Sequence, residues 1–501
     1  MNEHMRRIIL FLFALLIALP AICQEEIGYR GCRPGLGQLK HEHFTHRASN
    51  LLGRNSISNE TFKGDRRQLV VMAQFADYSF LGDSAQTMSQ WNKIFNSEYL
   101  SEGSFYGSVH DYFVDQSYGQ FRLTFDLYYI KVDSIYKYHS TAINDDNTKY
   151  LIQDIVPVLK ERVEDWAPYD WYGDGYVDQL LVVYAGKSRS DGGSDSTIWA
   201  HQWWMSEYVN CEPITITSGG HDYIIDSHCC APELSGDGDY GSFGTLCHEY
   251  SHCFGLPDFY SPTGKVVGNW DVMDNGLFNG SGFIPCSYSA YERAFMGWLT
   301  PEELTKEGTV TLPALQTQPV AYLVRNDGNA NEYYMIEFRQ KAGWDQKLPG
   351  SGLVIFHVDY DEQEFTYGWP NSVRRKRYTI FQANDNPDKP QGWAYPNSGN
   401  NSLTNTSTPA AELNNANKDS TLFMSKPITE MAVTKTMASL KFMIMETHPD
   451  PDPNTDPETG IEAVRYSPFN DAWFTIDGRR IEGMPTEKGL YIHNGRVVLI
   501  R

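Results

Sequence analysis

Beyond its N-terminal end, the 501-residue sequence contains no apolar stretch approaching 18 residues, and its one run of more than two basic residues, 374–377, has only four. It has 41 Lys and Arg against 63 Asp and Glu, so its formal net charge is −22. Binding to nucleic acid or to an anionic membrane needs clustered Lys and Arg, and neither is expected here. The sequence also lacks internal repeats of 20–50 residues and the charge content of a coiled coil. Aromatic residues make up 14%, which excludes a disordered chain.

The first 23 residues have the three parts of a secretory signal peptide. Two arginines precede the apolar run 8–19, and the small residues Ala21 and Cys23 follow it. The run is too short to span a bilayer. We therefore expect residues 1–23 to be a signal peptide cleaved after Cys23, and the mature chain to be secreted or at the cell surface, without a transmembrane segment. The alternatives are a buried core helix and lipid attachment at Cys23, which the preceding Ile22 fits poorly.

Changes in composition divide the remaining chain into five segments. Residues 24–66 are polar and irregular and are interpreted as a pro-segment, with an ordinary N-terminal arm as the alternative. Residues 67–300 mix helix and strand patterns, which indicates an α+β domain. Residues 301–446 contain short apolar or alternating runs between turns, which is typical of an all-β, sandwich-like domain. A Pro- and Asp-rich linker covers 447–460, and two Gly-containing turn signals predict hairpins in a small β tail, 461–501.

Apolar periodicity predicts individual elements inside these segments. In the α+β domain, strands are expected at 68–75, 121–130 and 178–185. Helices are expected at 86–100, 104–118 and 148–165, the last weakened by Pro157. In the following domain, examples of expected strands are 320–324, 332–338, 352–358, 377–381 and 438–445.

Residues 248–258 carry the pattern H-E-x-x-H-x-x-G-x-x-D. His248 and His252 are four residues apart, so on a helix they project from one face and can reach one tetrahedral zinc ion. Glu249 lies beside them without needing to bind the metal. It is placed to act as the general base that takes a proton from water activated by the zinc.

The third zinc ligand is expected just beyond the helix. Gly255 can adopt a positive φ, end the helix and turn the chain back, and Pro257 prevents the helix from continuing. Asp258 is then carried to the metal as an oxygen ligand. Glu292 is the alternative third ligand, because a glutamate on a downstream helix closes the site in another zincin arrangement. Without a metal, the two histidines would only pack or form hydrogen bonds, and Asp258 would cap a nearby element.

Several segments, in order, resemble the immune inhibitor A family of secreted bacterial zinc metalloproteases, which is related in style to metzincins. The resemblance covers about 65–446. Residues 269–273 are similar to the family segment that places a methionine, here Met273, below the metal as a Met-turn. Residues 289–299 resemble the helix that follows this segment, and residues 332–340 and 348–359 resemble the β region after it. The resemblance implies a zincin-like catalytic domain over 67–300.

A possible calcium loop and two other features lie outside the zinc motif. Asp170, Asp174 and Asp178 surround a glycine turn as calcium ligands do, although the spacing departs from an EF-hand and an Asp- and Gly-rich turn is the alternative. Cys32, in the pro-segment, is a candidate latency thiol for the open zinc position, with a structural or unpaired cysteine as the alternative. His201 lies in a segment that resembles one of the same family, and we expect it to be structural.

Residues 474–480 and 488–492 resemble the short C-terminal sorting domains of proteins exported by the type IX system, with an accessory β-module as the alternative. The export machinery is therefore an expected partner of the tail. The sequence as a whole predicts a secreted zinc endopeptidase that hydrolyses extracellular proteins. The alternative is a surface-anchored adhesion or glycan-binding protein on a zincin scaffold, against which the intact base Glu249 argues.

Overall fold

The computed structural model describes residues 62–139, 147–208, 210–366, 370–444, 473–475, 480–481, 485–486, 488–493 and 496–500. They form two compact units that divide between residues 445 and 446. The expected signal peptide, Cys32, and the linker 447–460 lie outside the described residues, as does the pro-segment 24–66 except for its last five residues. Within the described ranges, no helix has the length and apolar character needed to cross a membrane.

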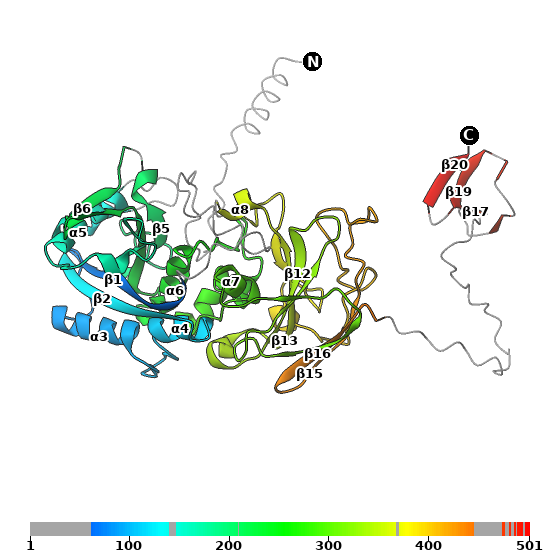
Figure 1. Cartoon of the computed structure of the whole chain (residues 1–501), viewed down its shortest axis with the longest axis horizontal. Helices are drawn as coiled ribbons and strands as arrows, with labels where there is room; N and C mark the ends of the chain where they lie inside the picture. The colour runs from blue at the N-terminus through cyan, green and yellow to red at the C-terminus, as the bar shows by residue number, and fades with distance from the viewer. Residues whose placement is uncertain are drawn as a thin grey trace, which may run out of the picture. The chain divides into compact units, whose positions relative to one another are not determined.

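A mixed five-stranded sheet organises the N-terminal half of the first unit (Figure 1). Its strands, in spatial order, are β2 (Phe121–Lys131), β1 (Gly64–Gln74), β4 (Leu180–Lys187), β8 (Ser227–Leu234) and β5 (His201–Trp204). The first four strands run parallel, and β5 is antiparallel to β8 at the edge. The apolar runs in β1 and β4 follow from this position, because a central parallel strand is covered on both faces.

Helices cover this sheet and connect its strands. They are α3 (Ser84–Asn96), α4 (Val109–Gln116), α5 (Thr148–Lys160) and α6 (Phe243–His252). Figure 1 shows α3 and α4 running along the sheet beside β2. The expected helices at 86–100 and 104–118 are shorter in the structure: α3 starts two residues earlier and ends at Asn96, and α4 is shorter at both ends. Asp83 and Ser108 close capping boxes that fix where the two helices start. Helix α5 continues through Pro157 and ends at Lys160.

A small three-stranded sheet lies beside the main one and contains β3 (Tyr176–Val177), β7 (His221–Ile225) and β6 (Ile214–Ser218).

Strand β1 begins earlier than its apolar run. The expected start was residue 68, but β1 starts at Gly64, and Phe62 before it is 3% exposed. The Phe62 ring packs edge-on against Phe254, with ring centroids 5.0 Å apart, and its carbonyl oxygen accepts a hydrogen bond from Trp298 Nε1 at 2.7 Å. Residues 62–66, assigned to the pro-segment from the sequence, are therefore built into the fold.

Two further sheets follow in the first unit. One contains β14 (Tyr378–Ile380), β13 (Gly352–Asp359), β12 (Glu332–Arg339), β11 (Tyr322–Arg325) and β9 (Glu302–Glu303). The other contains β10 (Gly308–Pro313), β16 (Met437–Phe442) and β15 (Ile428–Val433). The short helices α7 (Ala290–Phe295) and α8 (Glu362–Thr366) complete the unit.

The side chains of β12 alternate between two hydrophobic cores. Tyr333 and Met335 belong to the large core that also contains the main sheet and α6. Tyr334 and Ile336 belong to a second core, which they share with residues of β10, β15 and β16. Because successive side chains of a strand point to opposite faces, the sheet containing β12 is buried on both sides. This sheet joins the N-terminal half of the unit to the three-stranded sheet of β10, β16 and β15.

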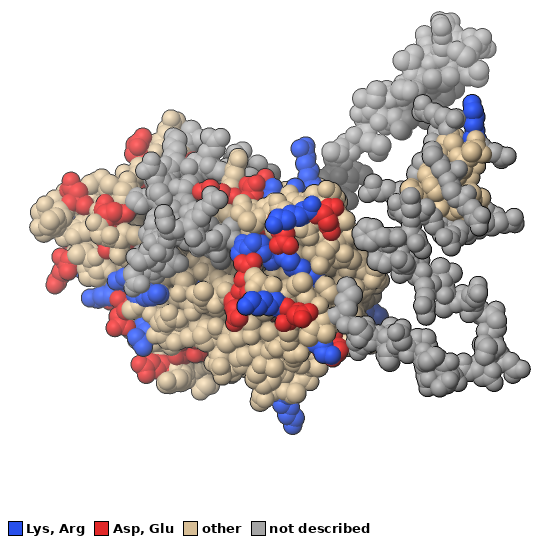
Figure 2. Space-filling view, turned by 45° about the vertical axis from the view of Figure 1, so that its right-hand side comes forward, with Lys and Arg blue, Asp and Glu red and all other residues tan. Residues whose placement is uncertain are grey.

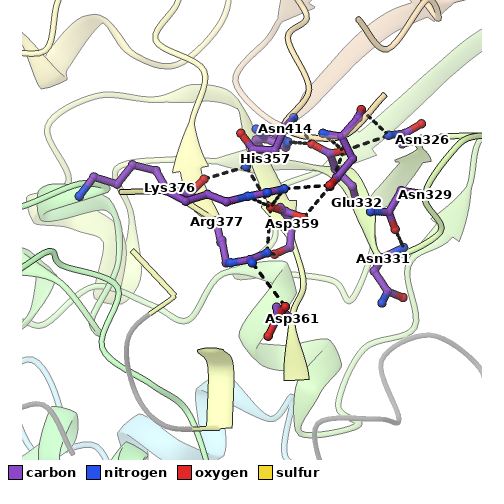
Figure 3. A network of polar contacts seen from close by, with 12 residues as sticks. Asn326, Asn329, Asn331, Glu332, His357, Asp359, Asp361, Lys376, Arg377 and Asn414 are labelled. Atoms are coloured by element: carbon purple, nitrogen blue, oxygen red, sulfur yellow. Dashed lines mark hydrogen bonds and ion pairs between the residues drawn. The ribbon is translucent and has the colours of Figure 1, made fainter. Parts of the chain in front are cut away.

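Glu332 on β12 and Asp359 on β13 are paired across neighbouring strands and lie at the centre of a polar network (Figure 3). Glu332 Oε1 accepts a hydrogen bond from His357 Nε2 at 2.7 Å. Asp359 Oδ2 accepts hydrogen bonds from Arg377 Nη1 at 3.0 Å and from Asn414 Nδ2 at 3.1 Å. The network fastens the loop that carries Asn414 to the sheet.

The second unit contains a four-stranded sheet in the order β18 (Arg480–Ile481), β17 (Trp473–Thr475), β19 (Gly489–His493) and β20 (Arg496–Ile500). The pairs β17/β18 and β19/β20 are antiparallel. These pairs flank the two turn signals found in the sequence, while the turn residues 477–478 and 494–495 lie outside the described residues.

Acidic and basic side chains are interspersed on the face of the molecule drawn in Figure 2. The six cysteines in the described ranges are all free thiols; they are Cys211, Cys229, Cys230, Cys247, Cys253 and Cys286.

Candidate metal centre

Two histidines project from α6 with their rings facing each other. The ring centroids of His248 and His252 are 4.8 Å apart and the rings are nearly perpendicular, at 88°. His248 Nδ1 lies 2.8 Å from the carbonyl oxygen of Val272, and His252 Nδ1 lies 2.7 Å from that of Leu256. A carbonyl oxygen only accepts, so each Nδ1 carries the proton. The lone pair of each Nε2 is then free to bind a metal, and histidine ligands are commonly held in this way.

The carboxylate of Asp258 lies close to the Nε2 atoms of both histidines. Its Oδ1 atom lies 3.1 Å from His248 Nε2 and 3.4 Å from His252 Nε2. The turn that brings it there passes through Gly255, whose φ is +89°, a conformation that favours glycine. Asp258 Oδ2 accepts a hydrogen bond from the hydroxyl of Tyr260 at 2.9 Å, which fixes the carboxylate.

These three atoms fit a zinc ion. His248 Nε2, His252 Nε2 and Asp258 Oδ1 are buried and make no hydrogen bond to any other described residue. Three electron-rich atoms that converge in this way repel one another unless a cation lies among them. Two imidazole nitrogens and one carboxylate oxygen are a common ligand set for a catalytic zinc ion, which keeps its fourth position open.

The charges around the histidines also favour a cation. Burial works against a charged imidazole, yet the carboxylates of Asp258 and Glu249 raise the pKa of His252 to about 9. Burial raises the pKa of Asp258, but the two histidines outweigh it and keep that pKa below its ordinary value. The carboxylates thus favour a positive charge at this position, which a bound cation would supply in place of a proton.

Glu249 lies beside the ligands and is buried. One ligand atom from each of His248, Glu249 and His252 lies within 4.8 Å of the other two. Glu249 is 0% exposed, and the His252 side chain is 12% exposed. Glu249 is therefore enclosed by its neighbours in the full chain.

Met273 lies in a segment that supports both the helix and the ligand loop. The carbonyl oxygen of Val272 orients His248, and that of Met273 accepts a hydrogen bond from the Phe259 backbone at 2.8 Å. The Met273 side chain is buried in the large core. The expected Met-turn residue is thus adjacent to the backbone that positions two of the three candidate ligands.

Glu292, the alternative third ligand, lies in a different cluster. It closes a capping box at the start of α7, where its Oε2 atom accepts a hydrogen bond from the Ser289 backbone at 2.6 Å. Burial and the neighbouring Asp271 raise the pKa of Glu292 well above its ordinary value. Glu292 thus serves the helix cap, and it is Asp258 that contacts both histidines.

The three aspartates of the expected calcium loop bond to their own backbone. Asp170 accepts hydrogen bonds from Gly173 and Gly175 at 2.8 and 2.9 Å. Asp174 accepts one from the Tyr176 backbone at 3.0 Å, and Asp178 accepts one from Trp171. These bonds are those of an Asp- and Gly-rich turn, and the geometry gives the calcium site no support.

Sequence reasoning missed the groups that orient the ligands. The carbonyl oxygens of Val272 and Leu256 have no side-chain signature, so no sequence pattern could have indicated them. Tyr260 follows Asp258 by two residues, but a tyrosine at that distance is not by itself a signal. These groups are recognised only because the fold brings them to the ligand atoms.

Comparison with known proteins agrees with this geometry. Residues 66–299 match the family model described as the catalytic domain of immune inhibitor A peptidase M6. Immune inhibitor A from Bacillus thuringiensis subsp. alesti is 24% identical over 293 residues, an alignment that covers 47% of this chain and 40% of that relative. The chain thus matches less than half of the length of this relative. By these matches, residues 66–299 are similar to the catalytic domain of the immune inhibitor A metallopeptidases.

Proposed function

We propose that the chain is a secreted zinc endopeptidase that hydrolyses peptide bonds of extracellular proteins. One observation carries the proposal: His248 Nε2, His252 Nε2 and Asp258 Oδ1 converge beside the carboxylate of Glu249. The match of residues 66–299 to a peptidase catalytic domain supports the same conclusion. In this account, residues 67–300 form a zincin-like domain, 301–446 a sandwich-like β domain and 461–501 a β tail.

His248, His252 and Asp258 hold the metal, and Glu249 moves the proton. A zinc ion bound there supplies a Lewis acid that acidifies water and polarises the scissile carbonyl group. Glu249 accepts the proton of the attacking water and then delivers it to the leaving nitrogen. The carbonyl oxygens of Val272 and Leu256 keep both imidazoles in the tautomer that presents Nε2. The segment that ends at Met273 supports the site, because the carbonyl oxygen of Met273 accepts a hydrogen bond from the Phe259 backbone, next to Asp258.

The substrate is proposed to bind in an extended conformation along β5. This strand is at the edge of the main sheet and is antiparallel to β8, and helix α6 packs against both strands. A peptide that pairs with an edge strand receives main-chain hydrogen bonds whatever its sequence. Protein substrates would therefore be selected mainly by accessibility of an extended segment.

Export and latency complete the proposal. Residues 1–23 direct export, the tail engages an export machinery, and residues 24–61 keep the chain inactive until they are removed, with Cys32 as the candidate latency thiol. The burial of Glu249 in the full chain supports an inactive precursor. The pro-segment must end before Phe62, because that residue is part of the core.

Hydrolysis of casein by the purified chain, freed of residues 24–61 and supplied with zinc, tests the proposal. We expect cleavage by the wild type, loss of cleavage with a chelator, and recovery on addition of zinc. Glu249→Gln should abolish cleavage while keeping the metal, because the amide cannot accept the proton. Binding of a glycan without any cleavage by the zinc-loaded wild type would overturn the proposal in favour of a binding protein on the same scaffold.

A further inference from the structure

A second group of potential metal ligands lies on the main sheet, away from the catalytic motif. His201, His228 and Cys230 each offer one ligand atom, and these atoms lie within 4.8 Å of one another. All three residues are 0% exposed. His201 lies on the edge strand β5, while His228 and Cys230 lie on its neighbour β8.

The strand register places all three side chains on one face. His201 pairs with Cys230 across the antiparallel strands, and His228 lies two residues before Cys230. Residues that are directly opposite, or two apart on one strand, share a face of the sheet. Cys229, between them, points to the other face, where its thiol forms a hydrogen bond with the thiol of Cys253 at the end of α6. The three candidate ligands therefore lie on the face of the sheet opposite to Cys229.

The two histidines are held as metal ligands usually are. His201 Nδ1 lies 2.6 Å from the carbonyl oxygen of Trp199, so this atom carries the proton and Nε2 carries the lone pair. His228 Nδ1 faces the carbonyl oxygen of Asp226 at 3.5 Å, and its Nε2 lies 3.2 Å from the Tyr208 hydroxyl. A ring proton donated to a backbone carbonyl is the arrangement that also orients His248 and His252.

Hydrogen bonds alone satisfy this cluster poorly. The 3.5 Å contact of His228 is at the limit of a hydrogen bond, and Cys230 Sγ makes none to the described residues.

We propose that His201, His228 and Cys230 form a second, structural site for a borderline-soft divalent cation, with Zn²⁺ as the preferred ion. Two imidazoles and a thiolate match the nitrogen and sulfur ligands that zinc prefers. With Zn–N of about 2.0 Å and Zn–S of about 2.3 Å, tetrahedral ligand atoms lie about 3.3–3.6 Å apart, so a modest inward rotation of the side chains suffices. The Tyr208 hydroxyl is the fourth polar group at this position.

Binding exchanges one proton for the ion. The Cys230 thiol loses its proton to solvent as the Zn–S bond forms, and the neutral histidines donate their lone pairs. Because the three residues are fully buried, the ion is acquired as the chain folds. Only four residue pairs join β5 to β8, so the bound ion would fasten this edge strand to the rest of the sheet.

Zinc content of the purified chain tests the stoichiometry. We expect close to two zinc ions per chain in the wild type, and close to one in His248→Ala, which removes a ligand of the catalytic ion. Cys230→Ser should also retain close to one. Cys229→Ser is the matched control, because its thiol points to the other face, and it should retain two. Wild-type zinc content in Cys230→Ser would overturn the second site.

Replacing zinc by cobalt detects a sulfur ligand in the wild-type chain itself. This test therefore still works if Cys230→Ser does not fold. Co²⁺ bound by a thiolate absorbs strongly in the near ultraviolet, whereas Co²⁺ bound by His248, His252 and Asp258 does not. The band should be present in the wild type and in His248→Ala, lost in Cys230→Ser, and kept in Cys229→Ser. A cobalt-loaded wild type without this band overturns the second site even if Cys230→Ser fails to fold. Casein hydrolysis that persists without the band leaves the proposed peptidase activity intact.

Discussion

The Nδ1 atom of His248 donates a hydrogen bond to the carbonyl oxygen of Val272, 2.8 Å away. This bond connects the metal helix to the segment that ends at Met273. The neighbouring Asp271 accepts a hydrogen bond from the hydroxyl of Tyr378 on β14 at 3.0 Å. The candidate metal centre is thus supported by the sheet that contains β14 as well as by its own helix. The geometry of the centre depends on contacts across the whole first unit.

Substitution of Asp258 should weaken zinc binding, whereas substitution of Glu292 should not. Asp258→Ala removes the oxygen that faces both histidines, so we expect zinc affinity to fall by at least about 100-fold. Glu292→Gln is the matched control, because Glu292 is a buried acid in the capping box of α7 and glutamine has a similar shape. Competition with a fluorescent zinc chelator measures both affinities. A large loss in Glu292→Gln together with wild-type affinity in Asp258→Ala would reverse the assignment of the third ligand.

Removal of the buried cation Arg339 should destabilise the first unit strongly. Its guanidinium group contacts both oxygens of Asp345, at 2.6 and 2.7 Å, and Glu337 at 3.0 Å, and all three side chains are 0% exposed. Arg339→Met leaves two buried carboxylates without their cation, which costs about 3–5 kcal/mol of unfolding free energy. Urea denaturation followed by tryptophan fluorescence measures this loss.

An exposed arginine provides the control for that experiment. The Arg122 side chain is 53% exposed and lies 3.6 Å from Asp65, and an exposed pair of this kind contributes at most about 1 kcal/mol. Arg122→Met should therefore unfold close to the wild-type urea concentration. Equal losses in the two variants would show that the buried network has no special role.

Asp274 should make the fold less stable as the pH rises. Burial raises the pKa of Asp274 to about 7, although its Oδ2 accepts three backbone hydrogen bonds, from Val266, Val267 and Gly268. Because the folded pKa lies above the unfolded value, this stabilising contribution is complete below about pH 4 and is lost as the pH rises through 7. Asp274→Asn keeps a side-chain oxygen that can accept the backbone hydrogen bonds but removes the negative charge of the carboxylate. It should be more stable than the wild type at pH 8, by roughly 2–4 kcal/mol, and should lose this advantage near pH 4.

Urea denaturation at several pH values measures this effect. Asp65→Asn, at a carboxylate that is 84% exposed, controls for the loss of one surface charge. An identical pH dependence of stability in Asp274→Asn and the wild type would show that Asp274 does not titrate in this range.

The site of truncation before β1 should determine the stability of the processed chain. A chain that starts at Phe62 keeps the ring packed against Phe254 and the bond from Trp298. A chain that starts at Arg67 loses both, together with the first residues of β1. Since loss of a buried phenylalanine side chain costs about 3–5 kcal/mol, the shorter chain should unfold at a clearly lower temperature. Equal midpoints of thermal unfolding would mean that residues 62–66 are not part of the stable fold.

The candidate metal centre could be predicted where its chemistry is local in the sequence. The spacing of His248 and His252 fixes their common face on a helix, and Gly255 supplies the turn that brings Asp258 back. Strands β1 and β4 could be predicted for a similar reason, since their apolar runs record burial on both faces.

The parts of the fold and of the site that could not be predicted from the sequence depend on contacts between distant segments. Strand β8 carries Ser227, His228 and Pro232 in its eight residues, so it has no apolar pattern, and its central place follows only from pairing with β4 and β5. The group of His201, His228 and Cys230 is created by that antiparallel register. The carbonyl oxygens that orient His248 and His252 are likewise set by the fold, which no residue spacing could indicate.

The most direct test of the central claim is the zinc content of the purified chain in three forms: wild type, His248→Ala and Glu249→Gln. If His248 is a zinc ligand and Glu249 only moves a proton, His248→Ala should contain one zinc ion per chain fewer than the wild type. Glu249→Gln should contain as much zinc as the wild type. Equal zinc content in the wild type and His248→Ala, measured on folded protein, would contradict the account.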